Sequence, residues 1–253
     1  MELAIETHAL SRRFGDVVAV DAVDLAVPRG SLYGFLGPNG AGKSTTIKCL
    51  TGLLRPSSGS VEILGLDPRA DTLAVKRQIG VIPEEQALFD RLTAVETLSF
   101  VGQVHGLDRA TIQSRSDQLF DLLALRADAG RLVADYSHGM RKKLALAVAV
   151  LPAPRLLFLD EPFEGIDAVA SRQIKEMLHE FVARGGTVFL TSHILEIIER
   201  LADHIGVIHR GRLVAQGPLA ALRSGDGGQT LEEVFLDLVG ASATERPPLE
   251  WLA

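Results

Sequence analysis

The segment GPNGAGKSTT, from Gly37 to Thr46, places three glycines before a lysine and three hydroxyl side chains. It fits the pattern G-x-x-x-x-G-K-[ST]. Glycines let backbone N–H groups curve around phosphate oxygens, Lys43 would neutralise the β- and γ-phosphates, and Ser44 would bind Mg²⁺. The segment therefore predicts a loop that binds a nucleoside triphosphate. The alternative is a glycine-rich turn with a solvated lysine.

The flanking residues predict the elements that such a loop needs. The apolar run LYGFL predicts a strand before the loop, and KSTTIKCLTG predicts a helix after it. The N-terminus of this helix, the positive end of its dipole, would then face the phosphates. The residues expected to hold the phosphates are Gly37, Pro38, Asn39, Gly40, Ala41, Gly42, Lys43, Ser44 and Thr45.

Two carboxylates follow a second apolar run. RLLFLDEP predicts a strand that is buried on both faces and ends in Asp160 and Glu161. At the carboxyl end of a central strand, Asp160 would hold Mg²⁺ through water, and Glu161 would orient or deprotonate the attacking water. An isolated Asp-Glu pair more often caps a helix or begins a turn. The phosphate loop in the same chain reverses that preference and predicts ATP hydrolysis.

The order of the predicted elements indicates a largely parallel sheet. The runs LAIETHAL, VVAVDAVDLAV, SLYGFLG and SVEILG predict strands in the first part of the chain. From Thr93, a capping box with Glu96 and apolar residues at helical spacing predict a helical insertion over residues of about 93–151. Strands and helices alternate afterwards, which predicts a parallel sheet with helices on both faces. Residues 224–230, SGDGGQT, predict a linker before an amphipathic helix, LEEVFLDLVG.

Composition and net charge limit the classes of partner that we expect for the chain. The chain of 253 residues is 47% hydrophobic, which is enough for a sizeable core. Its net charge of −6 offers no overall basic surface, so we expect no nucleic acid partner. The single cysteine, Cys49, is expected to be a buried core residue, and the basic trio Arg141, Lys142 and Lys143 a solvated helix face. We find no secretory signal and no apolar run of the roughly 20 residues that span a membrane.

Together these motifs resemble the ATP-binding-cassette ATPases over nearly the whole chain. The most discriminating segment, YSHGMRKKLALA, is similar to the family's Leu-Ser-Gly-Gly-Gln segment, which opens a helix and binds the γ-phosphate of ATP held by the other subunit. Ser137 and Gly139 match that segment, whereas His138 and Met140 depart from its commonest form. A serine at a helix N-terminus presents a hydroxyl, an N–H group and the helix dipole to an anion. Alone, Ser137 would be an ordinary N-cap.

The resemblance implies roles for four further residues. Phe14 matches the aromatic residue that stacks on adenine, and His193 matches the switch histidine that contacts the γ-phosphate, although either alone would more often be structural. Asp167 matches the aspartate of the loop that links the two active sites of a dimer, and it also fits an N-cap. Glu84 stands where the family usually has a glutamine that reaches Mg²⁺. Gln86 would replace it only if the loop shifted by two residues.

The family implies an α/β fold, with a P-loop NTPase (RecA-like) parallel-sheet core, an N-terminal antiparallel β subdomain and an inserted α-helical subdomain. We expect residues 1–223 to form this nucleotide-binding domain, and residues 224–253 to be a linker and a short C-terminal helical extension. The implied ligands are ATP and Mg²⁺. The catalytic set is Lys43, Glu161 and His193, and the metal set is Ser44, Glu84 and Asp160.

The resemblance also implies partners. Two cassettes enclose each ATP, so we expect a homodimer or a cassette heterodimer that closes on ATP and opens after hydrolysis. The leading interpretation is the energy-supplying subunit of a transporter, because PEEQALFDRLTAVETL and LEEVFLDLVG resemble cassettes of exporters with separate permeases. The partner would be an integral membrane permease, and the chain would be cytoplasmic, peripheral on the inner face of the cell membrane.

Two other classes of function fit the sequence less well. The first is a soluble cassette ATPase that acts on a ribosome, nucleic acid or cofactor-assembly complex. Ribosome-acting relatives generally join two cassettes in one chain, and DNA-repair relatives insert long coiled coils, and this sequence has neither feature. The second is a nucleotide-binding regulator without turnover, which Glu161 and His193 disfavour.

Overall fold

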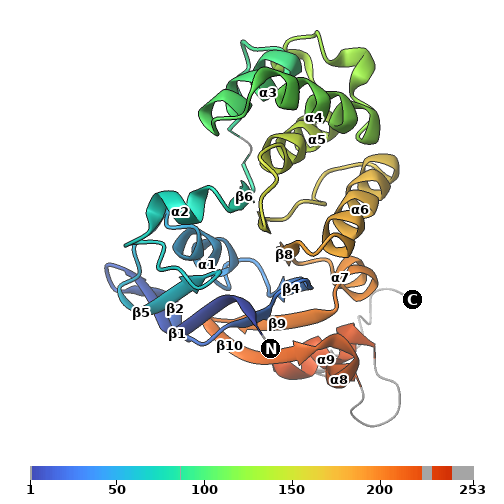
Figure 1. The fold of residues 1–253 in the computed structure, drawn as a ribbon. Helices are drawn as coiled ribbons and strands as arrows, with labels where there is room; N and C mark the ends of the chain where they lie inside the picture. Colours follow the sequence, from blue (N-terminus) through green and yellow to red (C-terminus); the bar gives the residue numbers. More distant parts are fainter. Residues whose placement is uncertain (1, 86, 224–229, 241–253) are drawn as a thin grey trace, which may run out of the picture.

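The computed structural model describes residues 2–85, 87–223 and 230–240. Within these residues, six strands form a central sheet in the order β10-β9-β4-β8-β7-β6 (Figure 1). Neighbouring strands are parallel except for β9 and β10, which are antiparallel. The strands are β4 Leu32–Leu36, β6 Ile79–Ile82, β7 Leu156–Leu159, β8 Thr187–Ser192, β9 His204–His209 and β10 Arg212–Pro218.

An antiparallel sheet lies beside the central one. Its long strand β1 pairs with β2, β3 and β5. These strands are β1 Leu3–Phe14, β2 Val17–Val23, β3 Ala26–Pro28 and β5 Ser58–Ile63. The single strand predicted over VVAVDAVDLAV is wrong, because this segment forms two strands, β2 and β3, which pair separately with β1. Asp24 and Leu25 lie at the break, where the Asp24 carboxylate accepts a hydrogen bond from Ala9 N at 2.6 Å and Leu25 N donates to the Thr7 hydroxyl at 2.8 Å.

Three helices form a group at the top of Figure 1: α3 Ala94–Val104, α4 Arg109–Leu122 and α5 His138–Val150. The short 3₁₀ helices η1 Arg126–Asp128 and η2 Val133–Asp135 connect α4 to α5. The predicted capping box of α3 is confirmed, because Glu96 N donates to the Thr93 hydroxyl and Thr93 N donates to the Glu96 carboxylate. The division of the chain into domains stays a prediction.

The remaining helices are α1 Lys43–Leu50, α2 Thr72–Lys76, α6 Ala168–Ala183, α7 Leu195–Leu201, α8 Leu219–Arg223 and α9 Leu231–Leu238. The helix predicted after the phosphate loop is confirmed as α1, and α6 and α7 are two of the helices expected to alternate with strands after the helical insertion. The predicted amphipathic helix LEEVFLDLVG is α9, capped by Thr230. The rest of the predicted linker and the tail after Gly240 lie outside the described residues. Over the described part of the chain, no helix combines the length and the apolar character needed to cross a bilayer.

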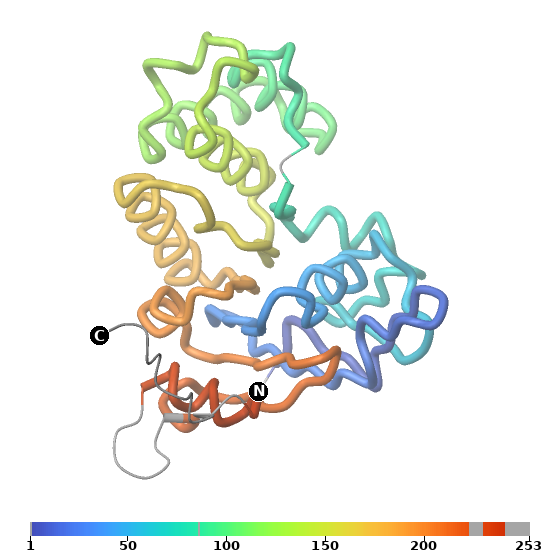
Figure 2. Tube along the Cα trace, turned by 180° about the vertical axis from the view of Figure 1, so that it is seen from behind, coloured from blue at the N-terminus to red at the C-terminus, as the bar shows by residue number. Residues whose placement is uncertain are grey.

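Buried apolar side chains cover both faces of the central sheet. Along β7, Leu157 and Leu159 pack toward the layer that contains α5, α6 and α7. Leu156 and Phe158 point to the opposite face, where α1 and the antiparallel sheet lie. Figure 2 shows the two layers from behind. Because both faces are buried, the strand needs an apolar residue at every position, which explains the uninterrupted run LLFL.

Phe189 on β8 lies at the centre of the second face. Its ring centroid is 5.6 Å from that of Tyr33, 5.3 Å from that of Phe35 and 5.8 Å from that of Phe158. Phe189→Ala would leave a cavity among these rings, so we expect the free energy of unfolding to fall by about 3–5 kcal/mol. Denaturant unfolding followed by circular dichroism measures the change.

The control for this prediction is Leu73→Ala. Leu73 lies on α2 and is 72% exposed. Its loss should change the free energy of unfolding by less than about 0.5 kcal/mol. Equal stability of the Phe189→Ala chain and the unmodified chain would show that the ring cluster does not hold this face together.

Candidate functional site

The phosphate loop runs from Gly37 to Gly42, between the end of β4 and the start of α1. Its first and last glycines have no room for a side chain. A Cβ atom at Gly37 would lie 2.4 Å from the carbonyl oxygen of Ile208. At Gly42 it would lie 2.4 Å from the carbonyl oxygen of Ala19, and Gly42 also has a φ of 110°. Both positions therefore require glycine, because the loop passes directly against β9 and the β2 strand.

The first turn of α1 is open to an anion. Gly42 is the N-cap, and among the described residues no side chain caps the helix and no acidic residue stands in its first turn. The N–H groups at this end are left for a ligand. Lys43 Nζ folds back over the loop and donates to the carbonyl oxygen of Gly37 at 2.8 Å. The ammonium group of Lys43 and the N-terminus of α1 thus point to the same anion-binding position.

A pocket of about 260 Å³ lies over this loop. It collects residues that are far apart in the sequence at the carboxyl ends of the parallel strands, where α/β sheets bind their ligands. Glu84 follows β6, Glu161 follows β7 and His193 follows β8. The lining residues are Ala19, Asn39, Gly40, Ala41, Gly42, Lys43, Ser44, Thr45, Glu84, Glu161, Glu164 and His193.

The Glu161 carboxylate is buried between two basic side chains. Its Oε1 atom lies 3.2 Å from Lys43 Nζ, and its Oε2 atom lies 3.0 Å from His193 Nδ1. Among the described residues Oε1 has no hydrogen-bond donor beyond this ion pair. A buried carboxylate oxygen of this kind is suited to accept a hydrogen bond from a water in the pocket.

The backbone of Glu161 is in an unusual conformation. Its φ of 48° lies in the left-handed region, which a residue with a side chain adopts only when its surroundings hold it there. Glu161 N donates to the Thr191 hydroxyl at 3.0 Å, and that hydroxyl donates to Asp160 Oδ1 at 2.6 Å. Strand β8 therefore fixes both carboxylates at the end of β7.

Lys142 was missed as a functional candidate. The prediction of a solvated helix face is wrong for this residue. Lys142 is only 5% exposed, because it lies on the inner face of α5 together with Leu146 and Ala149. That helical spacing is the sequence signal that could have revealed it. Its Nζ donates to the carbonyl oxygens of Glu161, at 3.0 Å, and of Glu164. Lys142 thus holds the turn that carries the strained Glu161.

Burial also changes the acidity of Lys142. The loss of hydration lowers the pKa of its ammonium group, while the carboxylates of Glu164, Glu161 and Glu84 act in the opposite direction. Its neighbours in the trio are half-buried and hydrogen-bonded to the protein. Arg141 pairs with Asp90 at 2.7 Å, and Lys143 Nζ donates to the Leu123 carbonyl oxygen at 2.9 Å.

The predicted metal residues offer oxygen ligands. Ser44 and Glu84 line the pocket, whereas Asp160 lies behind it, buried and bonded to Thr191. Across the described residues, no group of three or more His, Cys, Asp and Glu side chains is arranged to hold a metal ion. Hydroxyl and carboxylate oxygens suit Mg²⁺, which usually takes one or two carboxylates together with substrate phosphates and water. The donor chemistry therefore fits Mg²⁺ bound together with a nucleotide.

Ser137, His138 and Gly139 lie outside the pocket, at the N-terminus of α5. The Ser137 hydroxyl accepts a hydrogen bond from Met140 N at 3.3 Å, which confirms it as an N-cap. The segment lies against the start of α6, because a Cβ atom at Gly139 would be 3.8 Å from Asp167 Oδ2. Asp167 caps α6 through Ala170 N at 2.8 Å. Their roles toward a second subunit stay predictions.

Phe14 also lies outside the pocket lining. It is 45% exposed at the end of β1, and the Arg12 guanidinium stands 4.4 Å from its ring centroid. Adenine stacking on Phe14 stays a prediction, and Gln86 is outside the described residues. Cys49 is buried on α1, as predicted, and burial raises the pKa of its thiol to about 11.

Comparisons with known proteins decide the family. The family model described as "ABC transporter" matches residues 20–164, which is more than half of the chain. This chain belongs to the ABC transporter family. A solved structure titled "Structure of ATP binding subunit of ABC transporter" superposes with a TM-score of 0.88 and 33% identity, covering 94% of this chain and 99% of that chain. The predicted α/β P-loop NTPase fold is confirmed.

Two curated relatives match nearly the whole cassette. The daunorubicin/doxorubicin resistance ATP-binding protein DrrA of Streptomyces peucetius is 39% identical over 243 residues, covering 96% of this chain and 74% of the relative. The bacitracin transport ATP-binding protein BcrA of Bacillus licheniformis is 37% identical over 224 residues, covering 88% of this chain and 72% of the relative. The cassette is therefore an ATP-binding subunit of an ABC transporter, and an ATPase.

Lys142→Met tests whether Lys142 positions the catalytic turn. The substitution removes the ammonium that holds the carbonyl oxygens of Glu161 and Glu164, so the carboxylate should lose its alignment. We expect kcat for ATP hydrolysis to fall between about tenfold and hundredfold while KM changes by less than about threefold. Steady-state phosphate release measures both constants.

The matched control is Lys143→Met, one residue further along α5. Lys143 Nζ donates to the Leu123 carbonyl oxygen and to Gln173 Oε1, and among the described residues it makes no hydrogen bond to the turn at Glu161. Its kcat should stay within about twofold of the unmodified value. Equal losses in the two variants would mean that Lys142 only stabilises the helix, and circular dichroism spectra would identify that case.

Proposed function

We propose that this cassette binds ATP with Mg²⁺ between two cassettes and hydrolyses it to drive export through a separate membrane permease. The observation that carries the hydrolytic part is the buried Glu161 carboxylate, which faces the pocket between Lys43 and His193. A carboxylate held in this way beside a phosphate loop can orient and deprotonate a water molecule.

The remaining groups divide the work of phosphoryl transfer. The N–H groups of the phosphate loop and Lys43 Nζ would bind the phosphates and stabilise the charge that develops on them. Ser44, Asp160 and Glu84 would hold Mg²⁺, which neutralises phosphate oxygens when it is bound. His193 holds the Glu161 carboxylate in place and is near enough to the pocket to contact the γ-phosphate.

A second cassette would complete each site. Ser137 and Gly139 stand at an open helix N-terminus that does not line the pocket of its own chain. A serine N-cap is suited to an anion, so this segment would contact the γ-phosphate bound by the partner cassette. Asp167, which lies against Gly139, would connect the two sites of a homodimer or of a cassette heterodimer.

Two observations support a permease partner and export. The names of the relatives DrrA and BcrA concern daunorubicin/doxorubicin resistance and bacitracin transport, which favours movement of a toxic compound out of the cell. In this cassette, Phe89 and Phe100 are 50% and 48% exposed, and their rings meet edge to face at 5.3 Å. Exposed aromatic pairs are typical of protein interfaces. The cassette would then be cytoplasmic, peripheral on the inner face of the membrane.

Glu161→Gln tests the catalytic assignment. The amide cannot accept the proton of the attacking water, so we expect ATP hydrolysis to fall by about 10²–10⁴-fold while ATP binding persists. ATP should also trap a stable dimer, which light scattering after size exclusion would detect. Glu164→Gln is the control, because Glu164 lines the same pocket but Lys43 and His193 form their ion pairs with Glu161 and not with the Glu164 carboxylate. Normal turnover of the Glu161→Gln chain would remove the proposed base.

Purification from membranes tests the transporter assignment. The Glu161→Gln chain, held with ATP and Mg²⁺ in gently solubilised membranes, should bring down a polytopic membrane protein in near-equal amount, identified by mass spectrometry. A Phe89→Ser/Phe100→Ser version should lose this partner but keep its ATP binding, because the exposed ring pair is distant in sequence from the phosphate loop. Recovery only in the soluble fraction, with ribosomes, nucleic acid or assembly factors, would favour a soluble cassette ATPase instead.

A further inference from the structure

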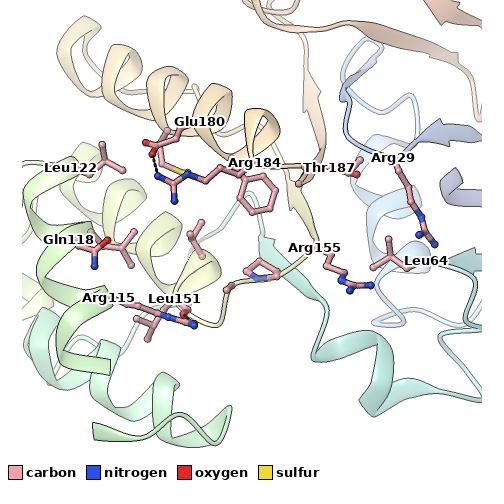
Figure 3. A pocket seen from close by; sticks show the side chains of 18 residues that line it. Arg29, Leu64, Arg115, Gln118, Leu122, Leu151, Arg155, Glu180, Arg184 and Thr187 are labelled. Atoms are coloured by element: carbon pink, nitrogen blue, oxygen red, sulfur yellow. Dashed lines mark hydrogen bonds and ion pairs between the residues drawn. The ribbon is translucent and has the colours of Figure 1, made fainter. Parts of the chain in front are cut away.

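A second and larger cavity lies at the opposite end of the parallel strands from the nucleotide pocket. Its volume is about 680 Å³, within the range of roughly 300–1,000 Å³ that is typical of small-molecule sites. Thr187, at the start of β8, and Arg155, just before β7, lie on its wall. In Figure 3, side chains from α4 form one side, α6 another, and Leu64 and Arg29 lie beyond Arg155.

The cavity is positively charged although the chain carries a net charge of −6. Four arginines, Arg29, Arg115, Arg155 and Arg184, line it together with a single carboxylate, Glu180. These five side chains leave a formal charge of +3, from four positive charges and one negative charge. A cavity of this sign attracts an anion.

Two of the four guanidinium groups have no carboxylate partner among the described residues. Arg184 pairs with Glu180, and Arg29 pairs with Glu2 at 2.7 Å. Arg115 donates only to the neutral carbonyl oxygen of Leu151, at 2.8 Å. For Arg155, no side-chain hydrogen bond or ion pair is formed with any described residue. Arginine binds phosphate and carboxylate groups through paired N–H donors, so Arg155 is the best-placed head-group ligand.

The rest of the wall is apolar. Leucine side chains from α4 and from the α5–β7 connection face Met177 and Phe181 of α6. This surface would contribute to binding by removing apolar ligand area from water. An inorganic anion would leave the apolar wall unused, and a neutral hydrocarbon would leave the arginines unused.

We propose that this cavity binds an amphipathic organic anion, with its phosphate or carboxylate head at Arg155 and its apolar body against the neighbouring apolar wall at Pro154 and Leu151. Binding of this kind needs no nucleotide and is independent of the proposed function.

Two strands that start at the cavity end at the nucleotide pocket. β7 starts beside Arg155 and leads to Glu161, and β8 starts with Thr187 and leads to His193. Helix α5 runs from the Ser137 cap to Val150 at the cavity. A ligand that prefers one placement of these elements would change ATP turnover, because coupling between two sites is reciprocal. This effect on turnover rests on the proposed function, whereas binding does not.

Calorimetric titration of the full chain with hexyl phosphate tests the proposal. Saturating ADP is present throughout, so that the phosphate loop is already filled. We expect saturable binding of one hexyl phosphate per chain, and binding at least about tenfold weaker for inorganic phosphate and for hexanol, because each has only half of the required chemistry. Absence of saturable binding, or equal affinity for hexanol, would overturn the proposal.

Arginine variants place the ligand in this cavity. Arg155→Gln alters an exposed side chain that has no hydrogen-bond or ion-pair partner among the described residues, so it should fold normally. We expect it to weaken hexyl phosphate binding by at least about tenfold. Arg172→Gln is the matched control, because Arg172 pairs with Glu176 on α6 as Arg184 pairs with Glu180, is 81% exposed and lies outside the cavity.

The outcomes separate the two proposals. Unchanged affinity in the Arg155→Gln chain, or an equal loss in the Arg172→Gln chain, would show that hexyl phosphate does not bind at this cavity. Hexyl phosphate should also change the steady-state ATPase rate of the unmodified chain but not that of Arg155→Gln. A chain that binds hexyl phosphate but hydrolyses no ATP would contradict the proposed function and leave the anion site in place.

Discussion

The buried carboxylate of Glu161 is the group on which the rest of the site depends. Removing a carboxylate from water is costly unless opposite charge and hydrogen bonds compensate it. Here the compensation comes from Lys43 on one side and His193 on the other, and Lys142 and Thr191 hold the backbone that presents the carboxylate. These groups come from α1, from α5, and from the end of β8 with the residue that follows it. The strand order β4-β8-β7 is therefore a requirement of the chemistry, because it brings those elements to one edge of the sheet.

The sequence predicted the parts of the site whose chemistry is encoded locally. The phosphate loop is a short pattern with a mechanism of its own, and the carboxylates stand at the end of an uninterrupted apolar run. Both patterns can be recognised without knowing which residues lie beside them in the folded chain. The helices after Thr93 and Asp167 were also predictable, because caps and helical spacing are local properties.

Features that depend on tertiary contacts were not predictable in this way. A run of three basic residues on a helix is usually solvated, and only the packing of α5 against the turn after β7 shows that Lys142 is inside. The break between β2 and β3 depends on β1, which pairs with both strands. The arginine-lined cavity is formed by α4, α6 and the start of β7, and no sequence spacing relates them.

Helix α5 combines two tasks on one rigid element. Its N-terminus presents Ser137 away from the chain's own pocket, and Lys142, less than two turns later, supports the turn of Glu161. In a dimer, the nucleotide bound by the partner cassette would contact the start of this helix. A displacement of the helix there would also displace Glu161 of the same chain. The two hydrolytic events would then be kinetically dependent on one another. The rate of ATP hydrolysis would rise sigmoidally with ATP concentration, and one impaired α5 in a mixed dimer would abolish hydrolysis at both sites.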